Sequence, residues 1–173
     1  MSCDLTQGFT IGCTENAGGV KRFLFATMPS DFAITQNASG MVTAITGTSL
    51  TYYAYEVTTG VGSASSFSDN NTVNQANGTS YVDQTALYVL NKMEQTKRNE
   101  VKILARAKMS VIVQDNNSKY WLMGATNGVR MTTGESGTGV QFADRNGYSL
   151  TFGAQEPENA VEVDPSIIAA LLV

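Results

Sequence analysis

The sequence predicts a mainly β protein built from antiparallel strands, with one α-helix and one long β-hairpin. Charged residues make up only 15% of the 173 residues, and their place is taken by Thr, Ser, Asn and Gly, which favour strands and turns. Short apolar segments alternate with turn signals along the chain, and one stretch has a helical pattern. A chain of this length is most economically a single domain, which we place at residues 1–163, followed by a C-terminal arm at 164–173.

The first strands are recognised by apolar runs between turn residues. Residues 20–26 follow a double glycine and predict the first strand. Residues 41–45 and 50–57 predict two more, because the Gly-Thr-Ser sequence between them favours a turn.

The next segment predicts a long hairpin at about residues 61–90. Read as a loop, residues 57–80 would be 24 residues without structure, which is improbable inside a compact domain. Asn77 and Gly78 form the strongest short hairpin-turn signal, so we expect arms at 63–73 and 79–90. The first arm is small and polar, and a long hairpin of this kind usually needs a neighbouring chain for stability.

One helix is predicted at about residues 92–108, and it carries most of the positive charge. Asn91 is the expected N-cap, with Glu94 completing a capping box. The six basic residues of the stretch are Lys92, Lys97, Arg98, Lys102, Arg106 and Lys108. Six bases against two acids give this stretch a charge of +4, and five bases against thirteen acids give the rest −8. This split predicts a surface for copies of the chain or for a partner, and the alternative is a solvated outer face.

The remainder of the chain predicts two hairpins and an acidic tail. Strands at 109–114 and 119–123 flank an Asp-Asn-Asn-Ser turn, residues 124–139 look like a mobile glycine-rich loop, and a last hairpin spans 140–152. The tail then becomes acidic, and its Asp-Pro-Ser sequence at residues 164–166 predicts a helix start before an apolar end. That apolar end must be covered by its own sheet or by the next subunit.

No catalytic apparatus is visible, and we predict that the protein is not an enzyme. Histidine is absent, which removes the commonest general base and metal ligand, and no phosphate-binding glycine motif precedes a helix. The carboxylates are scattered on turns and the tail, and none of the Asp-rich turns has the EF-hand spacing, so neither cofactor nor metal is expected. Cys3 and Cys13 are either a reduced pair or a small disulfide loop.

Charge and hydropathy also limit the partners. A pI near 4.7 argues against nucleic-acid binding as the main activity, although the basic helix alone could be such a face. No apolar run approaches the ~20 residues that a membrane helix needs, so no membrane partner is expected.

Several segments resemble the tail tube proteins of tailed bacteriophages, in particular a group from phages that infect Bacteroidetes. The resemblance lies in residues 3–13, 18–21, 89–92, 115–122 and 144–148, with Glu-Pro at 156–157, and together these span most of the chain. None of them is a diagnostic motif by itself.

The resemblance implies an antiparallel β-sandwich with one flanking helix, and a subunit that assembles into hexameric rings stacked into a hollow tube. Long hairpins would line a channel through which DNA passes transiently and without specificity, and loops or terminal arms would lock ring to ring. The implied partners are copies of the chain and other phage tail or head–tail proteins. The implied location is the virion, assembled in the host cytoplasm.

The residues expected at subunit interfaces lie on the hairpin, the basic helix and the tail. They are Phe67, Asp69, Val73, Asn77, Gly78, Lys97, Arg98, Lys102, Arg106, Glu158, Glu162, Ile167, Ile168, Leu171 and Leu172. Two alternatives stay open: a capsid decoration or head–tail completion protein, and a carbohydrate-binding β-sandwich module that would use Tyr52, Tyr53 and Tyr55.

Overall fold

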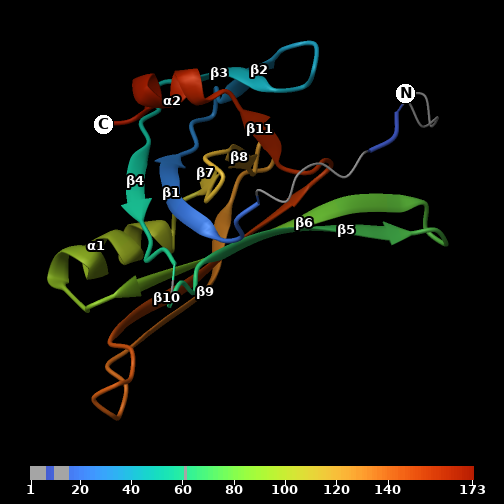
Figure 1. Ribbon diagram of the computed structural model, residues 1–173. Coiled ribbons are helices and arrows are strands. Elements are labelled where there is room, and N and C mark those ends of the chain that lie inside the picture. Colours follow the sequence, from blue (N-terminus) through green and yellow to red (C-terminus); the bar gives the residue numbers. More distant parts are fainter. Residues whose placement is uncertain (1–6, 10–15, 61) are drawn as a thin grey trace.

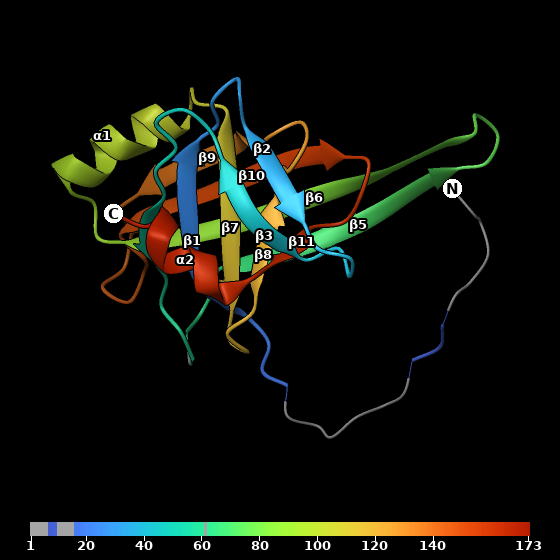
Figure 2. The same cartoon turned by 90° about the horizontal axis from the view of Figure 1, so that it is seen from above.

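Two β-sheets pack face to face, as Figure 1 and the perpendicular view in Figure 2 show. The computed structural model describes residues 7–9, 16–60 and 62–173, so Cys3 and Cys13 lie outside the described residues. The elements are β1 (Val20–Thr27), β2 (Ala33–Gln36), β3 (Val42–Thr46), β4 (Tyr53–Glu56), β5 (Ser66–Asn74), β6 (Thr79–Asn91), α1 (Gln95–Leu104), β7 (Met109–Asp115), β8 (Tyr120–Met123), β9 (Arg130–Gly137), β10 (Gly147–Glu156), β11 (Val161–Val163) and α2 (Pro165–Leu171). One sheet has the order β2-β3-β11-β8-β7-β1-β4 and the other the order β5-β6-β10-β9. The predicted mainly β sandwich with a flanking helix is confirmed.

The central strands of the seven-stranded sheet are buried on both faces. In β1, Phe23 and Phe25 point into the core between the two sheets, whereas Leu24 and Ala26 point into a second core on the opposite face. Because both faces are covered, β1 and β7 read as nearly continuous apolar runs without a polar alternation. This double burial explains why these two strands were easy to predict.

Aromatic rings hold the two sheets together. The ring centroids of Phe25 lie 4.9 Å from those of Phe152 and Tyr55, and the Phe23 ring lies 5.6 Å from that of Tyr88. Such packing adds to the area that the rings bury. Burial raises the pKa of Tyr55 to about 12, with a further contribution from the nearby Glu100 carboxylate, and it also raises the pKa of Tyr88.

The second core contains the C-terminal segment. Ile168 of α2 is only 3% exposed in this core, and the Tyr52 backbone N–H donates to the Leu171 carbonyl at 3.0 Å. The Asp164 carboxylate caps α2 by accepting from the Ser166 N–H at 2.9 Å, so the predicted helix start is confirmed. The predicted docking arm at 164–173 is therefore part of the subunit's own fold, and β11 joins the tail to the sheet between β3 and β8.

The predicted long hairpin is present as β5 and β6. The pairing runs from Ser66 opposite Leu87 to Asn74 opposite Thr79, and Gly78 has a φ of 64° in the closing turn. Along most of its length the hairpin is also supported by its own chain, because β6 pairs with β10 from Val82 to Asn91. Only residues 72–81 extend beyond β10 as a two-stranded ribbon (Figure 2).

Helix α1 is shorter than the predicted 92–108 and begins later. Asn91 is the last residue of β6, not an N-cap, because it pairs with Gly147 of β10. The Lys92 N–H donates to the Asn146 carbonyl at 2.6 Å, and Lys92 turns the chain with a φ of 65°. The N-cap is Glu94, which makes no side-chain capping bond. The backbone groups of Asn91 and Lys92 are therefore hydrogen-bonded to the β10 side of the sheet and do not form the predicted first turn of the helix.

The glycine-rich segment is not the predicted loop. Residues Arg130–Gly137 form β9, which pairs with β10 over its length. Gly134 is exposed in this strand, and a Cβ atom there would meet the Met131 sulfur at 3.1 Å and a Leu150 methyl at 3.4 Å. The predicted 140–152 hairpin is wrong in its first arm, because residues 138–146 form the loop that joins β9 to β10.

Candidate assembly surfaces

The outward face of the four-stranded sheet is broad and carries little charge. Along β6, Val82, Gln84, Ala86 and Tyr88 are buried, so the alternating side chains point away from the seven-stranded sheet. The strand register adds the outward residues of β5, β10 and β9 to the same face. These outward residues include Ser66, Ser68, Asn70, Thr72, Tyr81, Asp83, Thr85, Leu87, Thr133, Glu135, Ser149 and Thr151. Hydroxyl and amide side chains dominate the face. Its charged residues are Asp83, Glu135 and, opposite Gly153, Arg130, so two acids against one cation leave a weak negative charge.

Both edges of this sheet are unpaired within the described residues. β5 pairs only with β6, and β9 pairs only with β10. These edge strands have nine and eight residues and contain neither proline nor lysine. Soluble proteins usually protect long edges with such residues, because open backbone groups recruit other strands.

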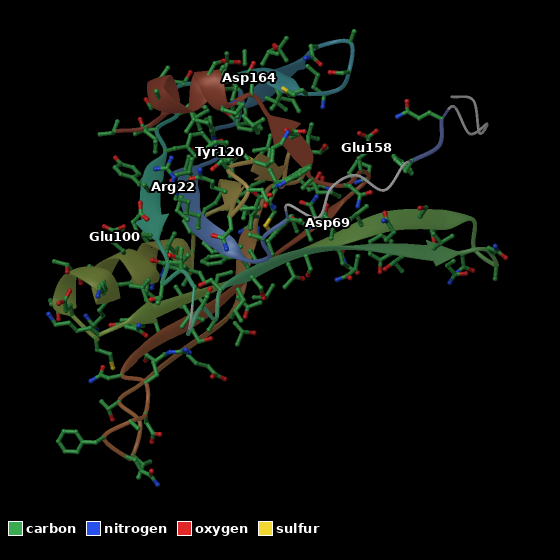
Figure 3. All side chains as sticks on the ribbon, viewed as in Figure 1. Arg22, Asp69, Glu100, Tyr120, Glu158 and Asp164 are labelled. Carbon is green, nitrogen blue, oxygen red and sulfur yellow. The ribbon has the colours of Figure 1, made fainter. Side chains whose placement is uncertain are left out.

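The predicted hairpin residues fall into two groups. Phe67 packs against the core between the sheets, and the Asp69 carboxylate accepts from the Ala160 N–H at 2.7 Å. Asp69 thus lies on the side of the hairpin that faces the rest of the subunit (Figure 3). Val73, which is 64% exposed, lies near the projecting tip with Asn77 and Gly78.

The basic helix covers one end of the sandwich and presents an incomplete basic face. Leu104 is buried in the core between the sheets, which anchors α1. Lys97 donates to the Asn91 and Lys92 carbonyls at 2.8 and 3.1 Å, so it holds the junction after β6 in place. A hydrogen bond and ion pair with Lys92 hold the pKa of Glu94 below its usual range. Of the predicted interface residues on the basic helix, Arg98, Lys102 and Arg106 are exposed, and the flanking Lys92 and Lys108 are exposed as well.

The predicted tail residues mostly contact their own subunit. Glu162 forms an ion pair with Lys119, and Ile168 is buried. Ile167, Leu171 and Leu172 are half-buried against the second core. Glu158 is exposed, and its carbonyl accepts from the Gln84 side chain at 3.4 Å. Val173 is the large apolar side chain of the tail that stays largely exposed, at 89%.

An exposed apolar loop between β9 and β10 was missed by sequence reasoning. Val140 is 98% exposed and Phe142 is fully exposed on this loop, which projects from the lower left of Figure 1. The Asp144 carboxylate accepts from the N–H groups of Gln141 and Val140, both at 2.8 Å, and these bonds lower the pKa of Asp144. The alternation in Val-Gln-Phe resembles a strand, so only the missing partner strand distinguishes it as a loop.

Other kinds of site find little support among the described residues. Within residues 7–9, 16–60 and 62–173, no group of three or more His, Cys, Asp and Glu is placed to hold a metal ion. In that part of the chain, no helix has the length and apolar character needed to cross a membrane. Tyr52 is fully buried and Tyr55 packs against the core, so the three tyrosines at 52, 53 and 55 do not form an aromatic platform for a sugar.

Comparisons of the chain with protein-family models, with curated proteins and with solved structures find no match.

Proposed function

We propose that this protein is a structural virion protein, a tail tube subunit whose copies form stacked hexameric rings around a channel for DNA. The observation that carries the proposal is the four-stranded sheet, with two long edges that contain neither proline nor lysine and a broad, weakly charged outer face. The resemblance of the sequence to phage tail tube proteins gives the proposal its biological setting. Its partners are then copies of itself and other tail or head–tail proteins, and its location is the phage tail.

The strand directions suit a closed ring. Neighbouring strands in the order β5-β6-β10-β9 are all antiparallel, so β5 and β9 run in opposite directions. When β9 of one copy pairs with β5 of the next, the antiparallel alternation continues across the junction. Such pairing uses a different edge on each copy, and a head-to-tail contact of this kind closes into a ring when the rotation between copies permits it. A barrel with many strands leaves an open lumen.

The chemistry of the outer face suits the passage of DNA. Phosphate groups bind strongly to clustered Lys and Arg. The outward face is dominated by Ser, Thr and Asn, with Asp83 and Glu135 as its acids and Arg130 as a single cation. A channel lined by this face repels DNA weakly and offers it few binding sites. The cations Arg98, Lys102 and Arg106 lie on and just after α1, away from that face, where an outer partner could contact them.

The proposal predicts that one edge backbone group is enough to disturb the ring. The Val89 N–H points toward β5, because it donates to the Ser65 hydroxyl at 3.1 Å. Backbone N–H groups alternate in direction along an antiparallel strand, so the N–H groups of the even-numbered residues from Ser66 to Thr72 point toward β6. The N–H group of the odd-numbered Asn71 therefore points to the open edge. Asn71→Pro therefore removes a donor from the edge without breaking the β5–β6 ladder, since an edge position tolerates proline.

The experiment compares Asn71→Pro with Asn71→Ala by negative-stain electron microscopy and circular dichroism. We expect both variants to fold, and only Asn71→Pro to lose rings. Rings in both variants would show that the β5 edge is not a subunit junction. Isolated particles of the unchanged protein at every concentration would favour the alternative, a capsid decoration or head–tail completion protein that attaches to a preformed lattice.

A further inference from the structure

A cavity of about 490 Å³ opens between the two sheets, beside the base of the hairpin. Its apolar wall includes Val20, Phe67, Val113 and Trp121, which come from the starts of β1, β5 and β8 and from the end of β7. This volume falls within the range of ordinary ligand pockets, so the cavity can hold a large side chain.

A carboxylate oxygen in this cavity has no hydrogen-bond donor. Asp69 lines the cavity, and its second oxygen accepts from the Ala160 N–H. Its first oxygen, Oδ1, is buried and has no partner among the described residues. Buried polar atoms are nearly always paired, so this oxygen points to a missing donor. The occupant that fits the cavity therefore combines an apolar group with a donor, preferably a cation.

The loop at residues 138–146 carries this combination. Val140 and Phe142 are exposed on it, and Arg145 is exposed three residues after Phe142. The hydrogen bonds to the Asp144 carboxylate order the loop before any partner binds. Because this order is already present, less conformational entropy is lost on docking.

The loop lies too far away to fill the cavity of its own subunit. It adjoins the Asn91 end of β6, since Asn146 accepts from the Lys92 N–H, whereas Asp69 pairs with Gln84. Asn91 lies seven positions after Gln84 along β6, and at ~3.4 Å per residue this places the two residues about 24 Å apart along the strand.

We propose that the 138–146 loop of one subunit docks into the cavity of a second copy, with Phe142 against the apolar wall and Arg145 beside the Asp69 carboxylate. This inference rests on the proposed tube function, in which it supplies the contact between successive rings. The loop and the cavity are different surfaces, so the loop of each copy binds the cavity of the next copy in a head-to-tail contact. Repeated head-to-tail contacts extend without closing when the rotation between copies does not close a ring, as a stack of rings requires.

The first experiment replaces Phe142 with the photo-crosslinking residue benzoylphenylalanine and mixes ¹⁵N-labelled with unlabelled protein. Crosslinks are mapped by mass spectrometry, and the same replacement at the exposed Ile103 of α1 is the control. We expect residue 142 to crosslink to segments 65–69 or 113–121, with mixed isotope pairs that prove contact between copies. Crosslinks from residue 142 to other parts of the chain, its N-terminal residues included, would overturn the proposal. Crosslinked pairs that never combine a ¹⁵N-labelled peptide with an unlabelled one would also overturn it, because they would show contact within one copy.

The second experiment separates this contact from the tube function itself. Phe142→Ser is compared by electron microscopy with Val173→Ser, which alters another exposed apolar residue. We expect single rings from Phe142→Ser and tubes from Val173→Ser. Normal tubes from Phe142→Ser would refute the docking contact and leave the tube function standing. Absence of both rings and tubes in the unchanged protein would refute the tube function and the docking contact together.

Discussion

Replacing Ile168 tests whether the C-terminal helix belongs to the subunit core or docks on a neighbour. Ile168→Ala removes three carbon atoms from a side chain that is 3% exposed among Tyr52, Leu24 and Ile112. At ~0.8 kcal/mol for each buried CH₂ group, lost burial contributes roughly 2.4 kcal/mol, and the cavity left behind brings the cost to about 3 kcal/mol. For a chain of this length, that loss lowers the Tm by roughly 6–12 °C.

Urea unfolding of Ile168→Ala and of the control Ile103→Ala measures the difference. Ile103 lies on α1 and is 57% exposed, so its loss should change the free energy of unfolding by no more than about 0.5 kcal/mol. Equal stabilities of the two variants, with loss of assembly only in Ile168→Ala, would show that α2 docks on another subunit and would refute our account of the tail.

Three further predictions concern buried polar groups and the basic helix. Glu156 is 3% exposed and accepts from the Thr126 and Asn127 N–H groups at 3.0 and 2.7 Å, so Glu156→Ala should destabilise the fold by about 2–4 kcal/mol in urea unfolding. Burial raises the pKa of Tyr52 to about 12 from an ordinary value near 10. The neutral Tyr52 side chain therefore contributes fully to the free energy of unfolding below pH 10, and this contribution is lost as the pH rises toward 12. Tyrosinate absorbance and urea unfolding midpoints measured across this pH range would follow the loss. Lys97→Met should cost about 1 kcal/mol because two carbonyls lose a donor, whereas Arg98→Ala should leave stability unchanged within about 0.5 kcal/mol.

Local patterns were enough to predict the elements whose sequences are dictated by nearby residues. The apolar runs of β1 and β7 and the turn between β7 and β8 were read correctly, since double burial and turn chemistry are visible in a few residues. The hairpin was also found, because Asn77 and Gly78 identify its turn.

The errors arose where distant pairing overrides local preference. β9 contains glycines that suggest a loop, and it is a strand because it pairs with β10 over its length. Asn91 is a good N-cap by type, yet the β6–β10 ladder uses its backbone. Of the predicted interface residues, Asp69 and Ile168 contact their own chain, a property that depends on the register of strands far apart in sequence.

In the proposed tail tube, copies of this chain assemble through their four-stranded sheets. Negative-stain electron microscopy of the purified protein over a concentration series measures this assembly. We expect rings that stack into hollow tubes as the concentration rises, with rings lost in Asn71→Pro and stacking lost in Phe142→Ser. Isolated small particles at every concentration would contradict it.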